Sequence, residues 1–329
     1  MSIKAKILWI DDNPSRKKQA MDLQDESGIN VEFISVKDKD LEKVKMSIRD
    51  KYKPELVIID HVLDKTKSTE GIRLGSTLTG FLRESWEGCP FLGITAAGNV
   101  SKIDVEKYTY DELIEGDRFS EYIQYIPNVL KGFKKSANAK TIEEWINWLE
   151  PPKEEIVRVK GCMPHHVKTN INKKGFTNRI YRWFRTKFYS MPGFLYDNDW
   201  VATFIGVKRE AISKYSEQLD KAKYTGIFND PYNVRWWKAK LYQVIYSGCK
   251  DVSAASRSSQ DVGNEVLKVK KEDRSICHVC KKKWPETIAY KDDSPTATLG
   301  QMHLRCTVAH PLYPYQPMFE EIRLMAGAD

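Results

Sequence analysis

Short apolar runs recur along the first 130 residues of this chain of 329 residues. Charged stretches separate the runs, and their apolar residues are spaced as on one face of a helix, as at Leu41, Val44 and Ile48. Short strands that alternate with helices are typical of a parallel, doubly wound α/β sheet, which binds ligands beyond the carboxyl ends of its strands. The strands are expected at 7–10, 31–36, 55–59, 90–95 and 122–126.

The pattern changes beyond this part of the chain. A helix is expected to end at Pro151 and Pro152, and the small polar residues that begin near Asp251 indicate a linker. We therefore expect an α/β domain over 1–135, a linker helix over 136–155, a basic, mainly α domain over 156–250, a linker over 251–272 and a small module with cysteine and histidine residues over 273–329.

The net charge of +8 is concentrated in the middle of the chain. Residues 141–250 contain 19 Lys and Arg against 11 Asp and Glu, whereas the segments on either side balance. A segregated basic block favours an anionic partner, most often nucleic acid, although a solvated lysine-rich surface is the alternative.

Composition also bears on the compartment. The six cysteines are few and unevenly spread, which favours a reducing interior. No apolar run approaches the roughly 18 residues of a membrane span, and the N-terminus has no apolar leader. We therefore expect a cytoplasmic protein without a membrane partner.

Carboxylates follow two of the expected strands. Asp11 and Asp12 end the first strand, and Asp60 ends the third. The first and third strands of a doubly wound sheet are neighbours, so the three carboxylates are expected to converge. A divalent cation, most simply Mg²⁺, would relieve their repulsion. The alternative is a pair of aspartates that points into water.

These residues resemble the receiver domain of bacterial response regulators. The resemblance covers about residues 1–130 and rests on Asp11–Asp12, on Asp60, and on Thr95–Ala96 after the fourth expected strand. It implies a flavodoxin-like, five-stranded fold in which Asp60 is the phosphoacceptor, Asp11, Asp12 and Asp60 hold Mg²⁺, and the Thr95 hydroxyl contacts the phosphoryl group. It also implies a histidine kinase or another signalling protein as a partner.

One feature departs from the receiver pattern. Receivers carry a lysine immediately before a proline at the end of the fifth strand. Here the proline is expected to be Pro127, and Ile126 precedes it. The alternative to a phosphorylated receiver is therefore a degenerate receiver that serves in docking or dimerisation.

A helix-turn-helix is expected in the basic block. Ala202, Gly206, Val207 and Ile212 follow the spacing of that motif, with a small residue at the helix crossing and a glycine in the turn. Asp199 is expected to cap the first helix, and the second helix is expected from about Lys208 to Leu219.

The second helix would present cations to the major groove of double-stranded DNA. We expect base or backbone contacts from Lys208, Arg209, Ser213, Lys214, Lys221 and Lys223. Flanking cations, among them Arg179, Arg182, Arg185 and Lys187, would contact phosphates. Such motifs also bind proteins, so a protein-docking role stays open.

The C-terminal module carries two short metal-ligand motifs. Cys277 and Cys280 form Cys-x2-Cys, and His303 and Cys306 form His-x2-Cys. Three thiolates and one imidazole suit tetrahedral Zn²⁺ and fill its coordination sphere, which favours a structural site. His278 and His310 are alternative nitrogen ligands, and a redox Cys-x-x-Cys is the alternative chemistry.

The sequence as a whole favours a DNA-binding regulator with a receiver-like input domain. The alternatives are an adaptor that docks partner proteins, and a DNA-processing or antiphage-defence component. Whether the protein is an enzyme stays open, with a non-enzyme favoured.

Overall fold

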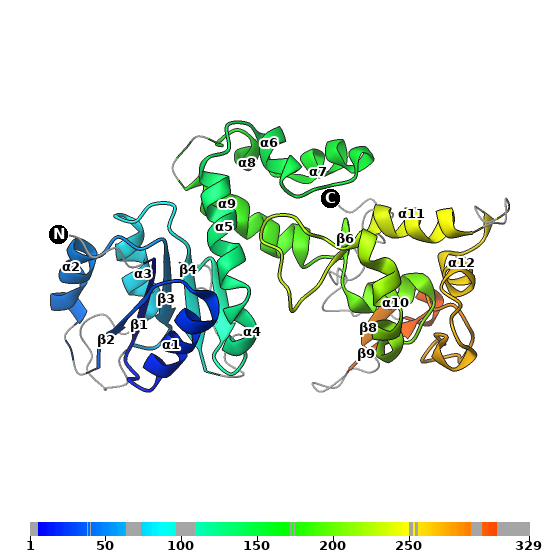
Figure 1. The fold of residues 1–329 in the computed structure, drawn as a ribbon, viewed down its shortest axis with the longest axis horizontal. Coiled ribbons are helices and arrows are strands. Elements are labelled where there is room, and N and C mark those ends of the chain that lie inside the picture. Colours follow the sequence, from blue (N-terminus) through cyan, green and yellow to red (C-terminus); the bar gives the residue numbers. More distant parts are fainter. Residues whose placement is uncertain are drawn as a thin grey trace. The chain divides into compact units, whose positions relative to one another are not determined.

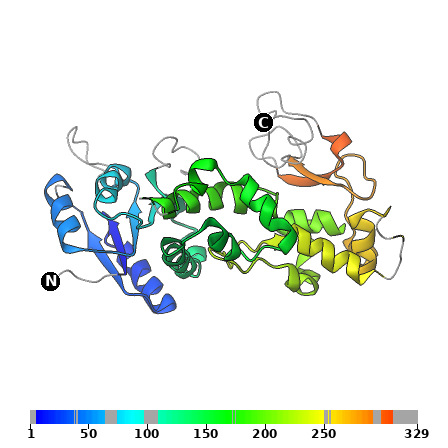
Figure 2. The same ribbon diagram turned by 90° about the horizontal axis from the view of Figure 1, so that it is seen from above.

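The computed structural model describes residues 6–37, 39, 41–63, 74–96, 109–171, 173, 175–249, 253, 256–290 and 298–307, with the backbone alone at 41–44. The chain divides into two compact units (Figures 1 and 2). The first unit comprises Met1–Trp148, Met163–Trp183 and Ile227–Tyr232. The second comprises Leu149–Cys162, Phe184–Gly226 and Asn233–Asp329.

The first unit is built on a sheet of five parallel strands in the order β2-β1-β3-β4-β5 (Figure 1). The strands are β1 (Ile7–Asp11), β2 (Val31–Ser35), β3 (Leu56–Asp60), β4 (Phe91–Thr95) and β5 (Glu112–Glu115). This is the flavodoxin-like strand order, and its switch point lies between β1 and β3. The predicted α/β receiver fold is therefore confirmed for this part of the chain.

Helices cover both faces of the sheet. Leu8 and Ile10 of β1 pack with Ile48, Leu78 and Leu82 on one face, whereas Trp9 packs on Phe119 on the other. The helices of this unit are α1 (Arg16–Ser27), α2 (Leu41–Lys51), α3 (Gly75–Arg83), α4 (Phe119–Ile123), α5 (Ile126–Ala137), α6 (Ile142–Asn147), α8 (His165–Lys168) and α9 (Phe176–Trp183). Because both faces are covered, the central strands β1, β3 and β4 are apolar and almost entirely buried.

The fifth strand does not lie where it was expected. Residues 122–126 contain the end of α4, a turn and the start of α5, and β5 is formed by Glu112–Glu115. Ile126, Val129 and Phe133 are buried at helical spacing, and the proline that follows Ile126 lies at the start of α5, where its missing N–H costs no hydrogen bond. The helical spacing of the buried residues therefore determines the structure here, and the short apolar run that had predicted a strand does not.

The basic block contributes two segments to the first unit. Asp111, just before β5, is buried and accepts hydrogen bonds from Arg83 Nη2 at 2.8 Å and Asn178 Nδ2 at 2.9 Å. Arg182 Nε also donates to Asp111, at 3.3 Å. The Phe228 ring packs on α5 at Gly132, where a Cβ atom would lie 2.2 Å from it. Arg182, expected to contact phosphate, is thus paired with a buried carboxylate of the first unit.

The second unit consists of short elements. They are η3 (Lys153–Glu155), α7 (Ile156–Cys162), η4 (Phe184–Tyr189), β6 (Leu195–Tyr196), α10 (Asn198–Ile205), η5 (Arg209–Lys214), η6 (Ser216–Ala222), β7 (Trp236–Trp237), α11 (Lys238–Gly248), α12 (Ser259–Val266), η8 (Lys271–Asp273), β8 (Thr287–Tyr290), β9 (Leu299–Met302) and η9 (Leu304–Cys306). The labels η mark 3-10 helices, except that η4 is a π-helix. The hairpin β8–β9 is antiparallel.

Helix α10 lies at the centre of the apolar core of the second unit. Asp197, rather than Asp199, caps it by accepting a hydrogen bond from Trp200 N at 3.0 Å. Gly206 ends it at a φ of +75°, as the turn requires. Asn264 of α12 donates to Ile205 O at 2.8 Å. The expected linker over 251–272 therefore contains a helix that packs against α10.

Candidate functional site

Three aspartates meet at the carboxyl edge of the parallel sheet. Asp11 ends β1, Asp12 follows it, and Asp60 ends β3. Strands β1 and β3 are paired in register from Ile7 with Leu56 onward, so their ends coincide. A carboxylate oxygen from each of the three lies within 4.8 Å of the others. The sequence-predicted ligands are thus brought together.

The surroundings of these carboxylates fit a cation. Asp11 is 1% exposed and accepts hydrogen bonds from Asn13 N at 2.8 Å and Trp9 Nε1 at 3.3 Å. Burial raises the pKa of Asp11 above its ordinary value, against the effect of those hydrogen bonds. Oδ1 of Asp12 is buried and has no hydrogen-bond partner among the described residues. An unpaired buried oxygen beside two further carboxylates is a ligand set suited to Mg²⁺.

Thr95 lies at the same edge of the sheet. It is the buried last residue of β4, and its carbonyl accepts a hydrogen bond from Gly116 N at 2.8 Å. Ile126, expected to end the fifth strand, lies in α5 instead. The residues that end and follow β5 are Glu115 and Gly116. The fifth strand therefore ends at Glu115, and the expectation that Ile126 ends it is wrong.

A second ligand cluster lies in the second unit. Cys277, Cys280, His303 and Cys306 each offer a ligand atom within 4.8 Å of the others. The turn after Cys277 supplies the first pair, and the segment after β9 supplies the second pair. Cys280 Sγ lies 3.2 Å from His303 Nδ1. The fold thus brings the ligand atoms of the two short motifs close together.

The groups around this cluster favour metal binding. His303 Nε2 lies 2.8 Å from the Lys283 carbonyl, to which it donates, so Nδ1 is left with its lone pair toward the thiols. Burial acts to raise the pKa of Cys277, but hydrogen bonds from backbone amides, including Cys280 and His303, outweigh it and lower the pKa to about 6. A hydrogen bond from the Lys282 amide lowers the pKa of Cys280 as well. Thiolates at neutral pH are the form that binds a metal ion.

The basic segment after α10 differs from the expected recognition helix. Instead of one α-helix from Lys208 to Leu219, two 3-10 helices, η5 and η6, meet at Tyr215. Asp273 accepts hydrogen bonds from Lys214 Nζ at 2.7 Å and from Tyr215 Oη at 2.9 Å, and its carbonyl accepts from Lys208 N at 2.8 Å. These hydrogen bonds stabilise the segment as two 3-10 helices.

The cations of this segment are only partly available to a ligand. Lys208, Ser213, Lys214 and Lys221 are exposed, whereas Arg209 and Lys223 are half-buried. Arg209 pairs with Asp199 and Lys223 pairs with Asp220 at 2.7 Å.

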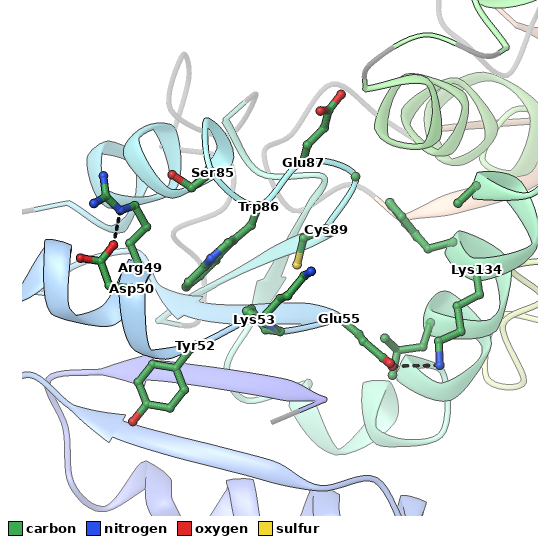
Figure 3. A pocket seen from close by; sticks show the side chains of 15 residues that line it. Arg49, Asp50, Tyr52, Lys53, Glu55, Ser85, Trp86, Glu87, Cys89 and Lys134 are labelled. Carbon is green, nitrogen blue, oxygen red and sulfur yellow. Dashed lines mark hydrogen bonds and ion pairs between the residues drawn. The ribbon is translucent and has the colours of Figure 1, made fainter. Parts of the chain in front are cut away.

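A hollow of about 670 Å³ that the sequence did not indicate lies at the opposite edge of the sheet (Figure 3). Glu55, just before β3, and Lys134 of α5 form an ion pair of 2.9 Å in its wall. Cys89 also lines it, but burial raises the pKa of this thiol far above its usual range.

Comparisons with known proteins concern the first unit. No protein-family model and no curated protein matches the chain. Among solved structures, a two-component response regulator from Clostridium difficile is similar, with 20% identity, a TM-score of 0.31, and coverage of 42% of this chain and 100% of that one. A CheY-like receiver domain protein from Methanospirillum hungatei JF-1 has 14% identity, a TM-score of 0.32, and coverage of 41% and 98%.

A third similar structure is the response regulator TrrA from Thermotoga maritima in complex with Mg²⁺ and beryllofluoride. It has 19% identity, a TM-score of 0.27, and coverage of 38% of this chain and 97% of that one. The receiver fold of the first unit is inferred from its strand order, β2-β1-β3-β4-β5, and not from these matches.

Among the residues that the structure describes, no helix has the length and apolar character of a membrane span.

Proposed function

We propose that this protein is a cytoplasmic DNA-binding regulator whose first unit accepts a phosphoryl group on Asp60. The convergence of Asp11, Asp12 and Asp60 within 4.8 Å carries the proposal. Three carboxylates so close repel one another unless a cation lies between them. The buried, unpaired oxygen of Asp12 among the described residues supports the same conclusion.

The chemistry follows from the place of Asp60 at the end of β3. An oxygen of its carboxylate forms a bond to the phosphorus of a phosphodonor, such as a phosphohistidine in a kinase. The bond from phosphorus to the donor's leaving atom breaks, and that atom keeps the electron pair. Mg²⁺ at this site would neutralise charge on the phosphoryl oxygens. The hydroxyl of Thr95 would donate a hydrogen bond to one of them.

Calorimetric titration with Mg²⁺ tests the site. We expect the wild type to bind one Mg²⁺, and Asp12→Asn to bind it at least tenfold more weakly because a ligand charge is lost. Asp117→Asn, a nearby exposed carboxylate, is the matched control and is expected to bind Mg²⁺ as the wild type does. Wild-type protein that binds no Mg²⁺ would remove the basis of the proposal.

A structural zinc ion is proposed for the second unit. The support is the donor set of Cys277, Cys280, His303 and Cys306, together with the hydrogen bond that orients His303. Tetrahedral Zn²⁺ takes such a set with no open position. Elemental analysis of the purified protein should find one zinc per chain, and Cys280→Ser should lose most of it.

The DNA contact is proposed for the exposed cations of the second unit, Lys208, Lys214 and Lys221. Phosphate contacts make binding depend on salt, so Lys221→Ala should weaken binding to every duplex and reduce the salt slope by about one unit. The measurement uses the full chain and several unrelated duplexes. Binding that is absent at ~50 mM salt, where phosphate contacts are strongest, would leave the adaptor as the function.

The adaptor has one observation in its favour. Arg209 and Lys214, expected to meet DNA, form ion pairs of 2.6 Å and 2.7 Å with Asp199 and Asp273. Such pairing neutralises part of the basic surface. An adaptor would bind a partner protein through the same unit, with an affinity that does not fall steeply with salt.

A further inference from the structure

The guanidinium of Arg16 lies across the carboxyl edge of the sheet, beside the ends of β4 and β5. Arg16 is the first residue of α1. A Cβ atom built on Gly116 would lie 2.5 Å from Arg16 Nη2, 3.3 Å from its Cζ and 3.2 Å from the carbonyl oxygen of Thr95. The guanidinium therefore occupies the space over the residue that follows β5.

One backbone and one side-chain hydrogen bond position Arg16. Its backbone N–H donates to the Asn13 carbonyl at 3.1 Å, which closes the turn between the aspartates and α1. Its Nη1 donates to Gln19 Oε1 at 2.6 Å.

Gly116 leaves the room that the guanidinium needs. Its backbone is not among those with positive φ, so glycine is not required there for its conformation. Any larger residue would collide with the end of the Arg16 side chain or force it aside. The glycine and the arginine thus form a matched pair at the place where receivers carry a lysine.

The charge of the phosphorylated site calls for a further cation. Three carboxylates and one divalent cation leave one net negative charge, and a phosphoryl group on Asp60 adds another. An arginine fork donates two parallel hydrogen bonds to phosphoryl oxygens and remains charged at all physiological pH values.

We propose that Arg16 binds the phosphoryl group at Asp60 and supplies the cation that the end of β5 lacks. This inference rests on the proposed function of Asp60. Before phosphorylation the guanidinium repels the metal ion slightly, because both are positive. After phosphorylation it attracts the new anion. Arg16 is therefore expected to act in opposite directions on the two ligands.

The test measures both ligands on the full chain. Mg²⁺ binding is followed by calorimetry, and beryllofluoride, a phosphoryl mimic, by ¹⁹F NMR in the presence of Mg²⁺. We expect Arg16→Ala to weaken beryllofluoride binding at least tenfold while Mg²⁺ binding is unchanged or becomes tighter. Arg16→Lys should restore part of the loss. Lys17→Ala, which removes an exposed neighbouring charge from α1, should change neither.

A second variant tests the geometry without a change in charge. Gly116→Ala places a methyl group 2.5 Å from Arg16 Nη2, closer than the two atoms can approach, so it should displace the guanidinium and weaken beryllofluoride binding several-fold. Arg16→Ala that binds beryllofluoride as the wild type does would overturn the inference, as would an equal loss of both ligands. Wild-type protein that binds Mg²⁺ but no beryllofluoride would instead reject the phosphoacceptor role of Asp60 and the inference with it.

Discussion

Arg209 and Asp199 form a bidentate ion pair within the second unit. Nε donates to Oδ1 at 2.7 Å and Nη2 donates to Oδ2 at 2.6 Å. Nη1 of Arg209 also donates to the Leu299 carbonyl of β9 at 2.6 Å. The guanidinium that was expected to contact DNA therefore joins η5 to α10 and to strand β9.

Arg209→Ala is expected to lower the free energy of unfolding of the second unit. The pair is about 29% exposed on the Arg209 side, so solvent screening limits the loss to about 1 kcal/mol. Urea unfolding monitored by fluorescence measures it. Lys208→Ala, at an exposed neighbour, should change the free energy by less than about 0.5 kcal/mol. Equal stability of the two variants would contradict a structural role of Arg209.

Gly206→Ala should destabilise the second unit by roughly 1–3 kcal/mol. The φ of +75° disfavours any side chain, and a Cβ atom would lie 2.5 Å from Asn264 Nδ2 and 2.8 Å from Gln260 Cβ. Gly161→Ala is the control, because Gly161 lies in α7 with open space around its Cβ position, and alanine there should stabilise slightly. Urea midpoints of both variants are compared with that of the wild type.

Asp273 is expected to make the free energy of unfolding of the second unit depend on pH in the acid range. Its hydrogen bonds with Lys214 and then Tyr215 lower its pKa below 3.8 in the folded protein. The folded state therefore binds fewer protons, so this stabilisation is present above the unfolded pKa and is lost as the pH falls through the folded pKa.

Urea unfolding at a series of pH values tests this link. Asp273→Asn should be less stable than the wild type near pH 7, and the difference should shrink as the pH approaches 3. A difference that stays constant over this range would show that the carboxylate charge has no part in it.

Removal of zinc is expected to destabilise neighbouring helices of the second unit as well as the ligand cluster itself. Gln301 of β9 donates through Nε2 to Thr203 Oγ1 at 3.1 Å and to the Val207 carbonyl at 2.8 Å. Because metal binding supplies much of the folding free energy of a small module, chelation should increase hydrogen exchange in α10 and η5 as well as in β8 and β9. The exchange of β1 and β3 should not change. Changes confined to residues 275–307 would contradict this coupling.

The parts of the fold that the sequence predicted are those with a strong local signal. β1, β3 and β4 are apolar runs buried on both faces, and the Cys-x2-Cys motif needs only a turn to bring its thiols together. Strand β5 was missed because Glu112–Glu115 has only two apolar residues and lies at the edge of the sheet. Its burial depends on neighbours that the local sequence does not reveal.

The single α-helix expected from Lys208 to Leu219 was wrong for a different reason. Its spacing suits a helix, but the segment breaks at Tyr215, between η5 and η6, where Asp273, far along the chain, accepts hydrogen bonds from both Lys214 and Tyr215. The position of Arg16 could not be predicted either, because it depends on the absence of a side chain at Gly116. Both are tertiary effects that override local propensity.

We propose above that Asp60 accepts a phosphoryl group at a Mg²⁺ site. The most direct measurement is intact-protein mass spectrometry after incubation of the full chain with acetyl phosphate and Mg²⁺. We predict one added phosphoryl group in the wild type, and none in Asp60→Asn or when EDTA replaces Mg²⁺. A wild type that gains no phosphoryl group, or an Asp60→Asn variant labelled to the same extent, would contradict the account.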